Sequence, residues 1–347
     1  MNKFAREANK AAVALGSSTK AYADASLIYY QQGLGDTEAK ERARITTMVA
    51  NVTGQSASAA SEQLTAIWNG YKVNAAEAEL YIDKVAKVAA QTGADLEELS
   101  TGMSKVASAA NIMGVDIDEL NAQLATVITV TRQAPESVGT AFKTIYARIN
   151  AIELGSEDAE TTLKSYTKTM LEYGVNVLDM NGKLRDTGDV IAEIGGKWGT
   201  MTKEQQLGLA QAMAGQRQYN NLLALFDNWD MYNDALHESQ TAMGTLQEQQ
   251  DIYSESVAAA ANRSKAQFES LYSSILTSDS LTGFYDFTGN IAATFEKIFG
   301  SFGGGLKSLV PILLSIASLF SRQIANGAAN LVNNLSKARA EADLVQQ

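Results

Sequence analysis

Hydrophobic residues recur at helical spacing through residues 1–153. One set falls at i, i+3, i+4 and i+7, on a single helical face: Leu64, Ile67, Trp68 and Tyr71. A second stripe continues toward Gly93 with Leu80, Tyr81, Lys84, Val85 and Val88. Because a period near 3.6 residues is typical of an amphipathic helix, these stripes predict short antiparallel helices around an Ala-rich core.

Several helix starts are marked by side chains that can accept the free backbone N–H groups. Asp95 and Asp116 each precede acidic residues in the first turn, where the helix dipole favours negative charge. Two further starts have the spacing of a capping box: Asn74 with Glu77, and Thr202 with Gln205. Glycine favours a left-handed helix end and proline interrupts a helix, so breaks are expected at Gly114, Pro135 and Gly215.

The pattern changes between residues 154 and 244. A helix is predicted over 157–172, and Val175 and Val177 then alternate with polar residues before Asn181-Gly182. Asn-Gly between such runs favours a hairpin turn in which both residues have positive φ. The fold class predicted is therefore all-α, with helical hairpins and long helices and one small β-hairpin near 174–186. Further helices are expected at 189–198, from Thr202, and at 217–239.

Residues 245–276 predict one long helix with a continuous seam. The seam consists of Leu246, Tyr253, Val257, Ala260, Ser264, Phe268, Leu271 and Ile275. Two steps of 11 residues, from Val257 to Phe268 and from Ser264 to Ile275, favour a nearly straight seam over a strict heptad coil. The pattern leaves open whether this seam packs on other helices of the same chain or on a second chain.

The last part of the chain predicts a helix over 284–300, a Gly-rich hinge at 303–305 and an apolar run from Leu309 to Phe320. That run is too short to span a bilayer alone, whereas 298–320 is long enough but includes Lys307 and the glycines. A buried helix, a re-entrant segment and a membrane span all remain open. The chain divides into four predicted parts: 1–153, 154–244, 245–300 and 301–347. The polar helical tail has no stop signal, so we expect the natural polypeptide to continue.

Composition narrows the possible chemistry. The 347 residues contain no Cys, one His and two Pro, and 28 basic against 39 acidic side chains give a net charge of −11. Without Cys there is no disulfide, thiolate nucleophile or Cys-ligated zinc. The acidic balance argues against specific nucleic-acid binding, because that affinity comes largely from Lys and Arg. We expect no enzyme, no cofactor, and no catalytic, cofactor-binding or metal site.

The candidate sites are each better explained by structure. His237 has no second ligand nearby in sequence, and Asp179 begins a stretch that lacks the twelfth-position Glu of a calcium loop. Glu255 resembles the start of a lytic transglycosylase signature, but the Gly-rich continuation is absent. The glycines at 303–305 have no Lys-Ser/Thr in the register of a phosphate-binding loop.

The order of the sequence features is more specific than any one of them, and it resembles the core region of phage tail tape measure proteins. The matching stretches run from about residue 25 to 300: YQQGL at 30–34, LEELSTGM at 96–103, AANIMG at 109–114, VDIDEL at 115–120, SVGTAF at 137–142, IYARI at 145–149, GVNV at 174–177, GKLRD at 182–186, AGQR at 214–217, LLAL at 222–225 and AMGT at 242–245. The long flanking coiled-coil region of that family is not recognisable here.

The resemblance implies a structural virion component that sets tail length, scaffolds tail tube assembly and is ejected to aid genome delivery. It implies location in the tail lumen, and in the host cytoplasm during assembly. The implied partners are copies of the chain itself, the tail tube protein, tail assembly chaperones, distal tail proteins and the host membrane. The alternative is a membrane-active helical protein that inserts 298–320 into a bilayer. Packing roles are expected for Trp68, Tyr146, Gly182 and Phe268.

Overall fold

The computed structural model describes residues 3–149, 168 and 170–277. The chain divides into two compact units, Met1–Ser273 and Ser274–Gln347. Every contact discussed below lies within the first unit. The predicted helix at 284–300, the Gly-rich hinge, the apolar run and the tail fall outside the described residues. The helix predicted over 157–172 is described only at residue 168 and from 170 onward, where it is helical. The division into four parts stays a prediction.

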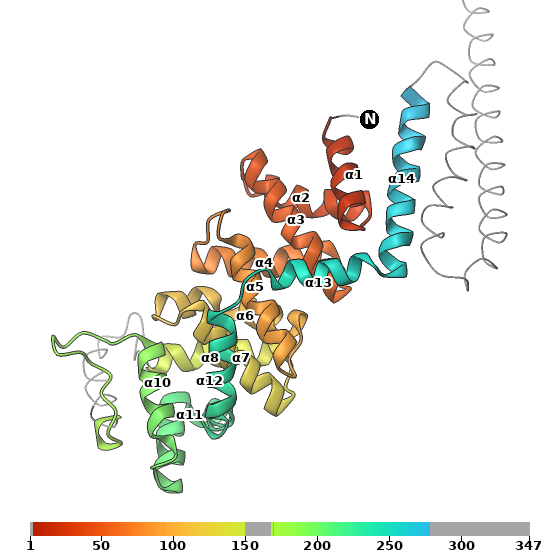
Figure 1. The fold of residues 1–347 in the computed structure, drawn as a ribbon. Helices are drawn as coiled ribbons and strands as arrows, with labels where there is room; N and C mark the ends of the chain where they lie inside the picture. The colour runs from red at the N-terminus through yellow and green to blue at the C-terminus, as the bar shows by residue number, and fades with distance from the viewer. Residues whose placement is uncertain (1–2, 150–167, 169, 278–347) are drawn as a thin grey trace, which may run out of the picture. The chain divides into compact units, whose positions relative to one another are not determined.

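The described residues fold into α-helices, which confirms the all-α class (Figure 1). The helices are α1 (Lys3–Leu15), α2 (Thr19–Gln31), α3 (Asp36–Thr53), α4 (Ala57–Tyr71), α5 (Ala78–Gln91), α6 (Leu96–Ile112), α7 (Ile117–Thr131), α8 (Pro135–Ile149), α10 (Thr187–Trp198), α11 (Lys203–Asp227), α12 (Trp229–Gln240), α13 (Thr245–Ser254) and α14 (Val257–Thr277). None of the described helices is both long enough and apolar enough to cross a membrane.

Three of the predicted caps form complete capping boxes. Asp95, Asp116 and Thr202 each accept a bond from the N–H three residues on, and the Glu or Gln there reaches back to the cap. The fourth predicted helix start, at Asn74, lies too early in the sequence. Asn74 accepts a bond from the Glu77 N–H at 3.1 Å, but this closes a turn, and α5 begins only at Ala78.

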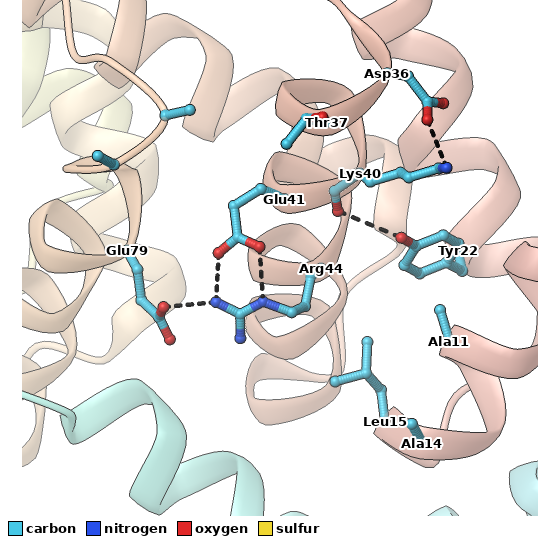
Figure 2. Close-up of a pocket in the computed structure, with 12 residues that line it drawn as sticks. Ala11, Ala14, Leu15, Tyr22, Asp36, Thr37, Lys40, Glu41, Arg44 and Glu79 are labelled. Atoms are coloured by element: carbon cyan, nitrogen blue, oxygen red, sulfur yellow. Dashed lines mark hydrogen bonds and ion pairs between the residues drawn. The ribbon is translucent and has the colours of Figure 1, made fainter.

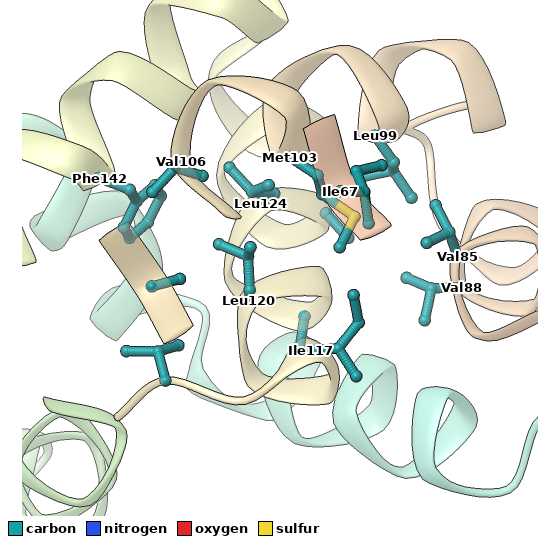
Figure 3. Packing of buried hydrophobic residues seen from close by; sticks show 14 of the residues in the cluster. Ile67, Val85, Val88, Leu99, Met103, Val106, Ile117, Leu120, Leu124 and Phe142 are labelled. Atoms are coloured by element: carbon teal, nitrogen blue, oxygen red, sulfur yellow. The ribbon is translucent and has the colours of Figure 1, made fainter. Parts of the chain in front are cut away.

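Helix α6 lies at the centre of the core, packed between α4 and α8. Small residues allow both approaches, since Gly70 of α4 lies against Ala107 and Gly139 of α8 lies against the Gly102 carbonyl. Larger side chains from α5, α6, α7 and α8 fill the space beside them, among them Leu99, Val106 and Leu120 (Figure 3). Close packing of three helices therefore depends on Gly and Ala at the contacts and on branched apolar side chains around them.

The predicted apolar stripes are confirmed in part. Leu64, Ile67 and Trp68 are fully buried, and the Trp68 indole N–H donates to the Ala78 carbonyl. In the second stripe Val85 and Val88 are buried, but Leu80 is 40% exposed. The buried face of α5 also includes Ile82 and Asp83, because α12 and α13 pack against this helix as well.

The predicted β-hairpin near 174–186 is not shown. Among the described residues no strand occurs, and a single antiparallel bridge joins Leu178 to Leu184. Gly182 has the expected positive φ of 74°, but Asn181 does not, so the turn is not the predicted type. The physical reason is Asp179, whose carboxylate accepts bonds from the backbone N–H groups of Asn181 and Lys183 and closes a wider loop.

The predicted helix at 245–276 is broken, which is a second correction. Helix α13 ends at Ser254 and α14 begins at Val257, because the Ser256 hydroxyl accepts the Ala259 N–H and caps a new helix. Val257, placed on the predicted seam, is 75% exposed. The side chains of Phe268, Leu271 and Ile275 lie outside the described residues.

Two breaks shape the helices predicted from Thr202 to 239. Gly215 takes φ 68° and ψ 171° inside α11, which confirms the expected break there. The helix predicted over 217–239 is interrupted once more at Asn228, between α11 and α12. The Asn228 side chain donates to the Ala224 carbonyl and so satisfies an acceptor at the end of α11.

Candidate functional site

A cavity of about 720 Å³ lies between α1, α2, α3 and the turn before α5 (Figure 2). Its apolar lining consists of small side chains, with four alanines and Leu15 among the residues that face it. Its polar lining comes mainly from α3 and consists of Asp36, Thr37, Lys40, Glu41 and Arg44, with Tyr22 and Glu79 from the neighbouring elements. No segment distant in sequence adds a reactive group to these residues.

The charges around this cavity are paired with one another. Arg44 contacts Glu41 at 2.6 Å and Glu79 at 2.5 Å, which links α3 to the start of α5. Lys40 contacts Asp36 at 2.6 Å and Glu7 at 2.7 Å, which links α3 to α1. Hydrogen bonds to these carboxylates raise the pKa of both basic groups, so Lys40 and Arg44 keep their positive charges at neutral pH. The cavity wall therefore holds helices together.

A group of carboxylates gathers where the first turns of α7 and α10 meet. The pKa of Glu119 is raised to about 7, mainly by burial. A bond from the Asp116 backbone lowers it, whereas the negative charges of Asp116, Asp189 and Asp186 add to the rise. The approach is close, because a Cβ placed on Gly188 would lie 2.1 Å from a Glu119 carboxylate oxygen. Two backbone bonds, from Thr187 to Met113 and from Gly188 to Gly114, hold the junction.

The sequence candidates for chemistry lie apart from one another. His237 is exposed near the end of α12, and Glu255 is exposed at the break after α13. Backbone hydrogen bonds, that from Lys183 foremost, lower the pKa of Asp179, whose carboxylate is engaged in its own loop. Across the part of the chain that the structure describes, no three His, Asp or Glu side chains form a candidate metal site. The 303–305 glycines fall outside those residues.

Two of the four residues expected to have packing roles are buried in the core. Trp68 lies beneath the Arg42 guanidinium, 4.9 Å from the ring centre, and Tyr146 donates to the Gln123 side-chain oxygen at 2.7 Å. Burial raises the pKa of Tyr146 well above its usual value, so the hydroxyl stays a donor. Gly182 provides the positive φ of its loop, and the side chain of Phe268 lies outside the described residues.

A buried polar network joins α5, α7 and α12, and the sequence reasoning missed it. Lys84 contacts Asp118 at 2.6 Å, and Asp118 also accepts a bond from Ser239 of α12. Asn121 donates to the Lys84 carbonyl and to Ser239. The available signal was the spacing of Asn121, which shares a helical face with Leu124, Ala125 and Ile128, where a polar side chain needs a partner.

Taken together, these contacts define a helical protein whose polar groups serve mainly to position helices. A family model described as phage-related minor tail protein matches residues 6–215, more than half of the chain. The chain belongs to that family, which confirms the phage tail resemblance and implies a structural component of the virion. No solved structure matches it significantly.

Proposed function

We propose that this minor tail protein is a tail tape measure protein without enzymatic activity. It lies in the tail lumen, sets tail length, scaffolds tube assembly and is ejected to aid genome delivery. The family match over residues 6–215 carries the proposal, because tail length control is a structural task. The ordered motifs at 96–120 and 137–149, which form α6 to α8, support it.

The helical content makes a ruler physically reasonable, since an extended helix adds about 1.5 Å per residue. The folded unit itself is short for its sequence, because its two ends meet: the Asn9 side chain donates to the Ala266 carbonyl at 2.7 Å. A ruler therefore requires extended stretches elsewhere in the polypeptide or opening of this unit inside the tail. Its partners are further copies of the chain, the tail tube protein, tail assembly chaperones and distal tail proteins.

The test is tail length by electron microscopy after an in-frame duplication of residues 203–276 in the phage gene. The duplication adds roughly 74 residues, or about 110 Å if the added helices lie along the tube. A gene recoded with synonymous codons over the same segment is the control. Longer tails support the ruler, and viable tails of unchanged length contradict it for this segment. Tails of normal length in the absence of the gene would overturn the proposal entirely.

A second candidate function follows from the apolar run between Leu309 and Phe320. Extended back to Ile298, this run becomes the segment 298–320, which is long enough to insert into a bilayer and would let the chain act on the host membrane. Purified protein should then release dye from liposomes, and Leu314→Asp should abolish release. Equal release by both proteins would contradict insertion of this segment.

A further inference from the structure

The segment 245–266, called the arm, folds back onto the beginning of the chain. It comprises α13 and the first half of α14, and α13 packs against α3 and α5 (Figure 1). Little apolar surface holds it. Leu246 is the one large apolar side chain that α13 buries, its other buried residues are Thr245 and Gln250, and Ile252 is 73% exposed.

The first turn of the arm is held by a carboxylate of the body. Asp83 on α5 is buried, and its two oxygens accept bonds from the Gly244 N–H at 2.8 Å and the Leu246 N–H at 2.9 Å. These N–H groups have no partner within their own helix, because they belong to its N-terminal turn. Asp83 thus caps α13 from a distance of more than 160 residues in sequence.

The arm in turn donates hydrogen bonds to the carbonyl groups at the C-terminal end of α1. Gln250 and Asn51 both donate to the Leu15 carbonyl, each at 2.9 Å, and the Tyr253 hydroxyl donates to the Gly16 carbonyl at 3.2 Å. Carbonyls at a helix C-terminus also lack intrahelical partners. Beside the packing of α13 on α3 and α5, the arm and the body are therefore joined by helix ends that cap one another.

Such an interface separates more easily than the packed core. Hydrogen bonds at helix ends exchange for water with little net change in free energy, whereas parting α6 from α4 and α8 exposes apolar surface. The fit is also incomplete, because the Gln249 side-chain oxygen is buried without a partner. Segments with few buried apolar contacts are those that open locally in native proteins.

We propose that the arm is a latch, which detaches from α1, α3 and α5 as a unit while the α4–α8 core stays folded. Detachment removes the contacts that tie residue 266 to residue 9 and frees the two ends of the unit to separate. The latch is a property of the folded chain and holds whether or not the protein measures tails.

Native-state hydrogen exchange of the full chain tests the latch. The Gly244 and Leu246 amides, which donate to Asp83, should exchange at least about tenfold faster than the Leu124 amide in the core of α7. Asp83→Asn removes a charged acceptor and should accelerate Leu246 by a further factor of about ten, with Leu124 unchanged. Asp95→Asn, which alters an exposed cap on α6, is the matched control and should leave Leu246 unchanged.

Two results would overturn the latch. One is equal exchange of Leu246 and Leu124 in the unmodified chain, which would mean that arm and core open together. The other is equal acceleration of both amides by Asp83→Asn, since the substitution would then act on global stability. Should Asp83→Asn fail to fold, Tyr253→Phe removes one hydrogen bond between the arm and the body, to the Gly16 carbonyl, and one within the arm, from Asn262. This substitution must accelerate hydrogen exchange of the Leu246 amide relative to that of the Leu124 amide. An unchanged ratio of the two exchange rates contradicts the proposal.

Discussion

The closest approach of two helices in the core makes a quantitative prediction possible. Gly139 of α8 faces α6, and a Cβ built on it would lie 2.2 Å from the Gly102 carbonyl oxygen and 3.0 Å from the Gly102 carbonyl carbon. Both atoms belong to the backbone, so no change of rotamer relieves the contact. Gly139→Ala must push α8 away from α6 by about 1 Å to reach an ordinary van der Waals separation.

Two terms of opposite sign set the size of the effect. Alanine stabilises a helix interior over glycine by about 1 kcal/mol. Overpacking a core typically costs about 1–3 kcal/mol, and a backbone clash between two helices belongs at or above the upper end. We therefore expect Gly139→Ala to lower the free energy of unfolding by about 2 kcal/mol, although its helix propensity alone predicts a gain.

Urea unfolding followed by circular dichroism measures the difference. The matched control is Gly196→Ala in α10, a helical glycine with no heavy atom within 4 Å of the added Cβ. The control should gain up to about 1 kcal/mol, because only the propensity term acts there. If Gly139→Ala proves as stable as Gly196→Ala, the close approach of α6 and α8 is wrong and so is the role assigned to their glycines.

Two further substitutions probe buried polar groups. Because the folded pKa of Glu119 is raised from 4.5 to about 7, its contribution to stability is fully present below pH 4.5 and is lost as pH rises toward 7. Glu119→Gln should reduce this loss of stability by about 1–2 kcal/mol, after allowance for the exposed part of the side chain. Unfolding curves at pH 5 and pH 8 measure the difference, and an unchanged pH profile would contradict the burial of this group. Tyr146→Phe takes the donor from the buried Gln123 oxygen and should lower stability by about 1–3 kcal/mol. The double variant with Gln123→Leu should recover part of that loss, and failure to recover any would show that the hydroxyl acts elsewhere.

Local signals predicted much of the fold. Asp95, Asp116 and Thr202 were predictable because a capping box satisfies backbone donors within four residues, whatever the rest of the chain does. The burial of Leu64 and Ile67 followed from their spacing alone. The break at Ser256 was missed because its capping signal lay inside a longer run of helix-forming residues, and a periodic pattern outweighed one hydroxyl.

The polar contacts between helices were harder to foresee, because their partners are distant in sequence. In the sequence, Asp83 is an acidic residue among apolar ones with no visible partner. Its partner is the Leu246 N–H at the start of α13, which reaches it only in the folded chain. Likewise, Asp118 and Ser239 meet only after α12 has folded back onto α7. Periodicity can show that a polar residue falls on a buried face, but the identity of its partner depends on tertiary structure.

The two kinds of interface place different limits on change. In the core, Gly139 leaves no space for even one methyl group and Gly102 leaves very little, so we expect α6 and α8 to move together. At the arm, Asp83 and Gln250 contact helix ends that water can equally well satisfy, so separation leaves no buried group unpaired. Any lengthening of the folded unit therefore begins at the arm, and variants that weaken Asp83 should extend the chain before they unfold its core.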